Sequence, residues 1–199
     1  MQDLTWRETL LIYTNPRVIA MTFLGFSGGL PFLLVFSTLT AWLTEGDVSR
    51  STIGFFAWIG ITYSTKVLWA PVVDSIPIPI LTKKLGQRRS WMLIGQMGIA
   101  LGLVLMSLIG PSDLLILSCC AFLVAFSSAT QDVAIDAFRI ESAEPEYQGA
   151  MSAAYVFGYR LALLIAGAGA LYLAEYFSWT IAYITMATLM LIGVITVIL

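Results

Sequence analysis

The chain has 199 residues, of which 59% are hydrophobic and 11% charged, and its net charge is −2. Soluble domains carry about a quarter charged residues, so this composition indicates a membrane protein, and the absence of a basic tail argues against nucleic-acid binding. The chain contains no histidine, which excludes Ser-His-Asp triads, HExxH zinc sites and histidine proton relays, and we expect no metal, no cofactor and no enzymatic activity.

Six apolar runs are long enough to cross a bilayer, which takes about 20 residues of helix. They lie at residues 18–43, 53–73, 91–109, 114–135, 150–174 and 179–199. The turns at 110–113 and 175–178 are short, so the runs that they join should be antiparallel neighbours. The adjacent cysteines Cys119 and Cys120 lie inside the fourth run, where packing is their expected role. We therefore predict an all-α membrane protein with six transmembrane helices.

The first two runs contain small, polar and charged residues that a lipid-facing helix would not need. In the first run, Gly25 and Gly29 allow another helix to approach closely, and Pro31 favours a kink or, alternatively, a gating hinge. The second run contains Lys66, with Tyr63 one helical turn before it. Ionisable side chains inside a membrane normally face a bundle interior or a wet cavity, so Lys66 and Tyr63 are candidates for solute binding.

The connection after the second run reads DSIPIPILTKKLGQRRSW. It resembles a stretched form of the major facilitator loop pattern Gly-x-x-x-Asp-Arg-x-Gly-Arg-Arg, with Ala70 where the first glycine is expected. The matching residues, to which we add Arg139 at the end of the fourth run, are Asp74, Gly86, Arg88 and Arg89. The resemblance implies that they latch the cytoplasmic side during conformational exchange. Alternatively, the basic cluster only sets the orientation of the chain and touches anionic lipid.

The fourth run ends in polar residues at helical spacing, in the stretch SSATQDVAIDAFRI. Asp132, Asp136 and Arg139 lie at positions i, i+4 and i+7, on one stripe of a helix that we expect near its cytoplasmic end. Asp132 and Asp136 are candidates for proton coupling, and Gln131 is a candidate for solute binding. The structural alternatives are an Asp136–Arg139 pair that anchors the helix end and an Asp132 that only neutralises a neighbour.

The fifth run contains Arg160 near its middle, with Tyr159 beside it and Tyr155 one turn earlier. Cations flanked by tyrosine rings suit an anionic solute that carries a sugar or a peptide, because arginine binds carboxylates and rings stack on sugars. These residues join the solute-binding candidates, and the alternative is that Arg160 neutralises Asp132. We expect the first, second, fourth and fifth runs to line a water-accessible cavity, and the third and sixth to face lipid.

The charges of the loops predict orientation. One side holds Arg7, Arg17, Lys83, Lys84, Arg88, Arg89 and Arg139, and the other side holds Arg50 alone. The basic side is therefore expected in the cytoplasm, together with the N-terminus. The sixth run extends to Leu199, so we expect a second, C-terminal six-helix half. The alternative is a self-contained six-helix protein.

Six helices with both ends inside correspond to one half of a major facilitator fold, which is built from two inverted repeats of three helices. The stretches FLGFSGG (23–29) and LVAFSSA (123–129) are weakly similar, as such repeats would require.

The chain resembles the AmpG-type muropeptide permeases in several motifs. The matching motifs are GFSGGLPFLLVFSTLTAWL, TIGFFAWIG, KVLWAPVVD, GQRRSW, SSATQDVAIDAF and GYRLALLIAGAGALYLAE, which cover nearly the whole chain. The resemblance implies a twelve-helix transporter in the bacterial inner membrane that imports anhydro-muropeptides, anionic glycopeptides used in cell-wall recycling, with protons. It points first to Gln131, Asp132, Tyr159 and Arg160. The alternatives are an acetyl-CoA-transporter-like or other permease for an anionic solute, a membrane-embedded enzyme, and a non-transporting sensor or scaffold.

Overall fold

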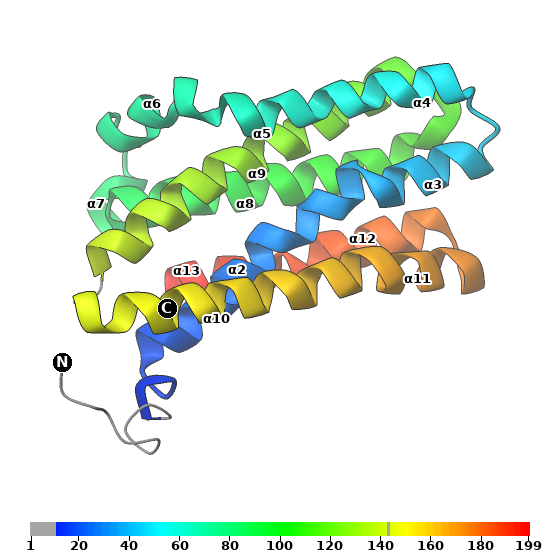
Figure 1. The fold of residues 1–199 in the computed structure, drawn as a ribbon. Coiled ribbons are helices and arrows are strands. Elements are labelled where there is room, and N and C mark those ends of the chain that lie inside the picture. Colours follow the sequence, from blue (N-terminus) through cyan, green and yellow to red (C-terminus); the bar gives the residue numbers. More distant parts are fainter. Residues whose placement is uncertain (1–10, 143) are drawn as a thin grey trace.

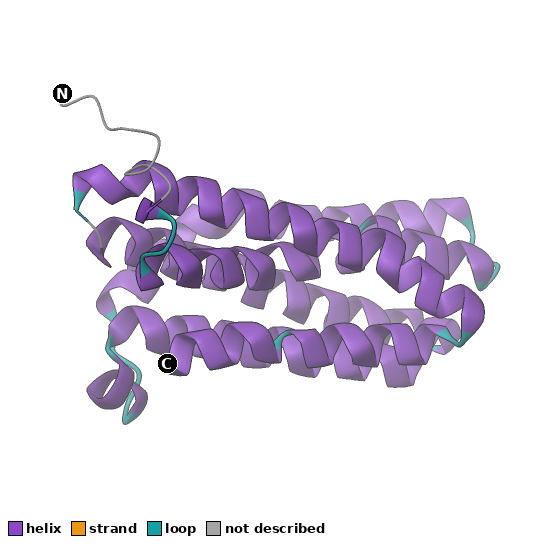
Figure 2. Cartoon of the chain, turned by 90° about the horizontal axis from the view of Figure 1, so that it is seen from below, coloured by secondary structure: helices purple, strands orange, loops and turns teal. Residues whose placement is uncertain are grey.

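The computed structural model describes residues 11–142 and 144–199, so Arg7 lies outside the described residues. Those residues form an elongated bundle of helices whose axes run in roughly the same direction, and no strand occurs among them (Figures 1 and 2). The prediction of an all-helical fold is therefore confirmed for the described part of the chain.

Five helical stretches are long and apolar enough to cross a membrane. They are Pro16–Glu45, Gln87–Ser112, Leu114–Ser142, Pro145–Tyr176 and Trp179–Ile198. Three of them contain a local irregularity. In the first stretch, α2 (Pro16–Val35) meets α3 (Ser37–Glu45) at Phe36. In the fourth, a π turn at Ile165–Gly169 joins α10 (Pro145–Leu164) to α11 (Ala170–Tyr176), and in the fifth, α12 (Trp179–Leu189) meets α13 (Leu191–Ile198) at Met190. The other two contain α8 (Gln87–Ile109) and α9 (Leu114–Ser142).

The second predicted run, residues 53–73, is not one continuous helix. It consists of α4 (Arg50–Phe56), a 3-10 turn (Ala57–Gly60), α5 (Ile61–Thr65), a second 3-10 turn (Lys66–Leu68) and α6 (Ala70–Ser75). Pro71 explains the second break, because it has no amide hydrogen for the carbonyl of Val67 and its ring clashes with the preceding turn. These segments still follow one path along the bundle (Figure 1). A count of six spans therefore stays a prediction.

Local capping explains where several helices begin. Asn15 accepts a hydrogen bond from the backbone of Arg17 next to Pro16, Asp113 accepts from Ile116 at the start of α9, and Ser178 accepts from Ile181 at the start of α12. After the short helix α7 (Leu81–Leu85), Gly86 turns the chain into α8 with φ of +82°, a conformation that favours glycine.

Helix α2 lies at the centre of the packing and contacts α10, α9 and α13. Its contact with α10 is very close, because a Cβ atom at Gly25 would lie 2.1 Å from the carbonyl oxygen of Tyr155, and one at Gly158 would lie 1.9 Å from that of Thr22. Two buried apolar clusters fill the bundle. The larger contains Leu30, Leu34, Ile99, Leu103 and Tyr183, and the smaller contains Val18, Met21, Met92, Ile135 and Met151.

One end of the bundle gathers most of the basic residues. Helices α2, α8 and α10 begin there, and α6, α9 and α13 end there (Figure 1). We call it the basic end, because it carries Arg17, Lys83, Lys84, Arg88, Arg89 and Arg139.

Candidate functional site

An ion pair joins the broken second run to α9 inside the bundle. The Nζ atom of Lys66 lies 3.8 Å from Oδ2 of Asp132, and the two side chains are 35% and 18% exposed. Lys66 begins the 3-10 turn that precedes α6, so the irregular backbone of this run positions the cation. A charged side chain inside a bundle needs a partner of opposite charge, and Lys66 and Asp132 are partners for each other.

Tyr155 of α10 and Gly28 of α2 complete the surroundings of Asp132. The Tyr155 hydroxyl lies 3.5 Å from Oδ1 of Asp132, at the limit of a hydrogen bond in which the hydroxyl donates. A Cβ atom at Gly28 would lie 2.9 Å from this hydroxyl and 3.4 Å from Asp132 Oδ1. Glycine at this position therefore leaves the room in which the tyrosine and the carboxylate meet.

Lys66, Asp132 and Tyr155 lie at the same depth. Asp132 precedes the end of α9 by about ten residues, Tyr155 follows the start of α10 by about ten, and Lys66 precedes the end of α6 by about nine. At 1.5 Å per residue, each is roughly 15 Å from the basic end. Asp132 is therefore deeper than the position near the helix end that we expected, because α9 continues to Ser142, beyond the apolar run that ends at residue 135.

The other tyrosines lie close to this pair. The ring of Tyr159 is 6.1 Å from that of Tyr155, and the ring of Tyr63 is 5.7 Å from Phe32 and 5.9 Å from Phe36. The Tyr63 hydroxyl is buried and has no hydrogen-bond partner among the residues that the structure describes. Tyr159 thus lies beside Tyr155, whereas Tyr63 packs against Phe32 and Phe36 with its hydroxyl buried.

Gln131 points into a different environment from its neighbour Asp132. It is fully buried, and its Nε2 donates to Oγ of Ser27 in α2 over 2.9 Å. Its Oε1, like both polar atoms of the buried Gln96 in α8, has no partner in the described part of the chain. Gln131 thus lies in the α2–α9 interface. Sequence reasoning missed Gln96, because an uncharged glutamine inside an apolar run gives little signal.

Arg160 stands apart from the ion pair. It is exposed on α10, among the exposed side chains of Phe157, Leu161 and Leu164, and forms no ion pair or hydrogen bond with any described residue. Within the part of the chain that the structure describes, the cation that pairs with Asp132 is Lys66 and not Arg160. The alternative that Arg160 neutralises Asp132 is therefore wrong for this conformation.

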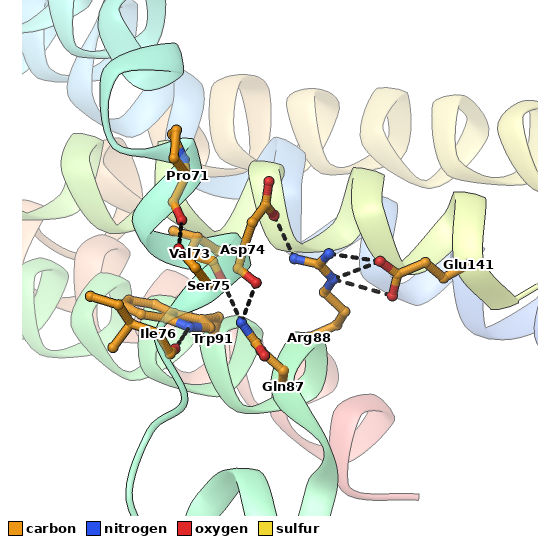
Figure 3. A network of polar contacts seen from close by, with 9 residues as sticks. All are labelled: Pro71, Val73, Asp74, Ser75, Ile76, Gln87, Arg88, Trp91 and Glu141. Carbon is orange, nitrogen blue, oxygen red and sulfur yellow. Dashed lines mark hydrogen bonds and ion pairs between the residues drawn. The ribbon is translucent and has the colours of Figure 1, made fainter.

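A second polar network lies at the basic end, around Arg88 (Figure 3). The NH1 atom of Arg88 is 2.5 Å from Oδ1 of Asp74, and its NH2 atom is 2.7 Å from Oε1 of Glu141. Gln87 donates to the carbonyl oxygens of Val73 and Asp74 over 3.1 and 2.5 Å. The network thus ties α6, α8 and α9 together. Sequence reasoning missed Glu141, because its partner Arg88 is 53 residues away in the sequence and only the fold brings the two together.

The remaining latch candidates have separate contacts. Arg139 lies 3.8 Å from Asp136, which is 57% exposed, and its NH1 donates to Oγ of Ser152 over 2.8 Å, so it ties α9 to α10. Gly86 provides the turn before α8. Arg89 is half-buried and forms no ion pair or hydrogen bond with the residues described, so the structure does not bring it to Asp74.

Comparison with known proteins identifies the family of this chain. Residues 18–199 match the sequence pattern of the Major Facilitator Superfamily. The chain belongs to this superfamily. As a major facilitator chain, it is similar to AmpG-type transporters: it is 38% identical to a putative transporter AmpG 4 of Rickettsia conorii and 36% identical to the anhydromuropeptide permease of Escherichia coli K12. These matches cover 94% and 92% of this chain but 46% and 37% of the relatives, so the chain spans less than half of their length.

Proposed function

We propose that this chain is the N-terminal six-helix half of a proton-coupled secondary transporter that imports anhydro-muropeptides across the bacterial inner membrane. The similarity to a permease of that name supports the solute class. The observation that carries the mechanism is the Lys66–Asp132 ion pair, 3.8 Å long and roughly 15 Å inside the bundle.

The proposed architecture counts α4 to α6 as the second span and divides the six spans into two inverted repeats of three. The weakly similar stretches 23–29 and 123–129 would be equivalent parts of the first and fourth spans. Their helices, α2 and α9, contact each other, and a hydrogen bond joins Ser27 to Gln131 beside them. In this arrangement, a C-terminal half would supply the opposite wall of the cavity.

The proposed solute site uses two cations, Lys66 of the 3-10 turn after α5 and Arg160 of α10. Lys66 is 35% exposed and Arg160 is exposed, so both can meet the carboxylates of a glycopeptide. Tyr63, Tyr155 and Tyr159 offer rings for the sugar and hydroxyl groups for its polar edge. Gln131 is buried, and we assign it to holding α9 against α2 behind the site.

Coupling to protons follows from competition for Lys66. A solute carboxylate that binds Lys66 removes the counter-charge of Asp132, whose side chain is only 18% exposed. A bare carboxylate is unfavourable there, so Asp132 takes up a proton as the solute binds and releases it when Lys66 returns. Asp136 is more exposed and paired with Arg139, which supports an anchoring role at the helix end.

The basic end would face the cytoplasm, because basic residues are retained on that side. The Asp74–Arg88–Glu141 network would then latch the cytoplasmic ends of α6, α8 and α9, and would open and close as the cavity changes its access. Nothing in the proposal requires catalysis, and both the superfamily and the permease name of a relative favour a transporter.

Uptake of labelled anhydro-muropeptide into proteoliposomes that contain the protein with both of its proposed halves, under an imposed proton gradient, tests the proposal. Arg160→Ala should reduce uptake at least about tenfold, since hydrogen bonds to charged groups contribute about 1.5–3 kcal/mol. Asp132→Asn should abolish the dependence of uptake on the proton gradient. Lys84→Ala, on the exposed side of α7, is the matched control and should transport normally.

The outcomes separate the alternatives. Uptake of another anionic solute in place of the muropeptide would favour a different permease, and binding without any uptake would favour a sensor. Unchanged gradient dependence in Asp132→Asn would remove that residue from the coupling mechanism.

A further inference from the structure

A crevice at the basic end is not used by the proposed transport mechanism. It has a volume of about 610 Å³ and lies between the first part of α2, the last part of α13 and the ends of α8 and α9. Its lining includes Arg17, Ala20, Phe23, Arg89, Ile195 and Leu199. We call it the basic crevice.

The lining changes from charged to apolar with depth. Arg17 lies one residue after the start of α2, and Arg89 lies two residues after the start of α8, so both cations are at the mouth. Phe23 is about six residues deeper along α2, which corresponds to roughly 9 Å. Phe23 and Ile195 are 45% and 56% exposed, so the apolar wall is open and not packed against the rest of the described chain.

The two arginines keep donors free. Arg89 forms no ion pair or hydrogen bond with the residues that the structure describes. Arg17 uses NH1 to donate to the backbone oxygen of Ser142 over 2.7 Å, and a guanidinium has five N–H donors. Both arginines also line an adjoining hollow of about 560 Å³ together with Glu141 and Glu144. Glu141 is already paired with Arg88, so Glu144 is the one carboxylate of this hollow without an ion pair among the described residues, against two arginines. The N–H groups that Arg17 and Arg89 keep unused can therefore attract an anion at the mouth.

The crevice has two guanidinium groups at its mouth and an apolar wall below them. An anionic phospholipid has the complementary arrangement, with a phosphate at its head and acyl chains below. A phosphate between the arginines would receive charge-assisted hydrogen bonds, and an acyl chain would cover Phe23, Ala20 and Ile195. We propose that the basic crevice binds one anionic phospholipid, with its phosphate between Arg17 and Arg89 and an acyl chain between α2 and α13. The proposal is independent of the transported solute.

Titration of the purified protein in detergent with dioleoylphosphatidylglycerol tests the proposal, with dioleoylphosphatidylcholine as the neutral-headgroup comparison. The readouts are the thermal unfolding midpoint and the half-saturating lipid concentration. Arg17→Gln/Arg89→Gln should weaken phosphatidylglycerol binding about 30-fold, because each basic residue contributes ~1 kcal/mol and 1.4 kcal/mol is tenfold. The matched control is Lys83→Gln/Lys84→Gln, which removes two charges at the same end and should leave binding unchanged.

A second arm tests the apolar wall. Ala20→Phe fills the crevice and keeps both arginines, so it should also weaken binding of phosphatidylglycerol. If the arginine double variant does not fold, the titration of Ala20→Phe with phosphatidylglycerol still tests the proposal. Equal binding of phosphatidylcholine, an equal loss in the lysine control, an unaffected Ala20→Phe variant, or the same stabilisation by inorganic phosphate alone would each overturn the proposal. No binding to the wild-type protein would overturn it too, and would indicate that another segment fills the crevice.

Discussion

The geometry of the Lys66–Asp132 ion pair suits both a structural role and the exchange with a solute anion that we propose. Their atoms approach to 3.8 Å, which is longer than a tight hydrogen-bonded pair, and the Lys66 side chain remains one-third exposed at 35%. Such a pair holds its helices together while leaving the cation open to a competing anion. A buried, bidentate pair would be harder to separate and less suited to exchange.

This geometry predicts the stability of single and double variants. Lys66→Met should destabilise the protein by about 1–2 kcal/mol, less than the 3–5 kcal/mol for a fully buried pair, because Lys66 is partly exposed. Lys66→Met/Asp132→Asn should be destabilised by less than the sum of the single changes, since neither charge is then left alone. Thermal unfolding in detergent measures this cycle. Lys83→Met is the matched control on α7, and strictly additive losses would contradict a direct interaction.

At the scale of the elements, the close contact between α2 and α10 depends on glycines, which have no side chain. A Cβ atom at Gly158 would lie 1.9 Å from the carbonyl oxygen of Thr22 and 2.9 Å from the amide nitrogen of Phe26. Both neighbours are backbone atoms, so the helices themselves would have to separate. Tyr155, which reaches Asp132 from α10, would move with them.

Gly158→Ala should therefore destabilise the protein by about 3 kcal/mol, the upper part of the range for overpacking a core. Gly149→Ala is the matched control on the same helix, because a Cβ atom there meets nothing within 4 Å. Alanine favours helix over glycine, so this control should be neutral or stabilised by up to about 1 kcal/mol. The unfolding midpoints of the two variants in detergent measure the difference. Similar midpoints would show that the close approach of α2 and α10 does not limit stability.

Hydropathy predicts most of the helices but not their details. Five of the six apolar runs coincide with helical stretches of membrane length, because lipid requires continuous helix over about 20 residues. The helix of the fourth run extends to Ser142, past the apolar limit at residue 135, because polar residues at a membrane interface can remain helical. Pro71 is visible in the sequence, but its effect depends on whether neighbouring helices tolerate the break.

Partners of side chains are harder to predict than helices. The sequence indicates that Lys66, Asp132 and Arg160 are candidates, but the rotation of α10 decides that Arg160 is exposed and that Tyr155 meets Asp132. Likewise, Gln131 and Asp132 are adjacent in sequence but have different partners, since Gln131 donates to Ser27 whereas Asp132 pairs with Lys66. Rotation about a helix axis is set by packing with other helices, which no local pattern encodes.

At the scale of the whole molecule, the distribution of charge makes orientation testable. Among the described residues, the basic end carries six of the basic side chains outside the proposed site, whereas Arg50 begins α4 at the opposite end. Inserted into a bacterial inner membrane, such a bundle should keep its basic end in the cytoplasm. The turn between α8 and α9, which contains Ser112, would then face the periplasm.

Cysteine labelling in intact cells measures this orientation. In a background with Cys119→Ser and Cys120→Ala, a membrane-impermeant maleimide should label Ser112→Cys from outside, because Ser112 is exposed. Lys84→Cys, exposed on α7 at the basic end, should be labelled only after the membrane is permeabilised. Ser128→Cys is the buried control and should stay unlabelled in both cases, since only 1% of Ser128 is exposed. Labelling of Lys84→Cys in intact cells would reverse the orientation, and the Arg88 network could then not latch the cytoplasmic side.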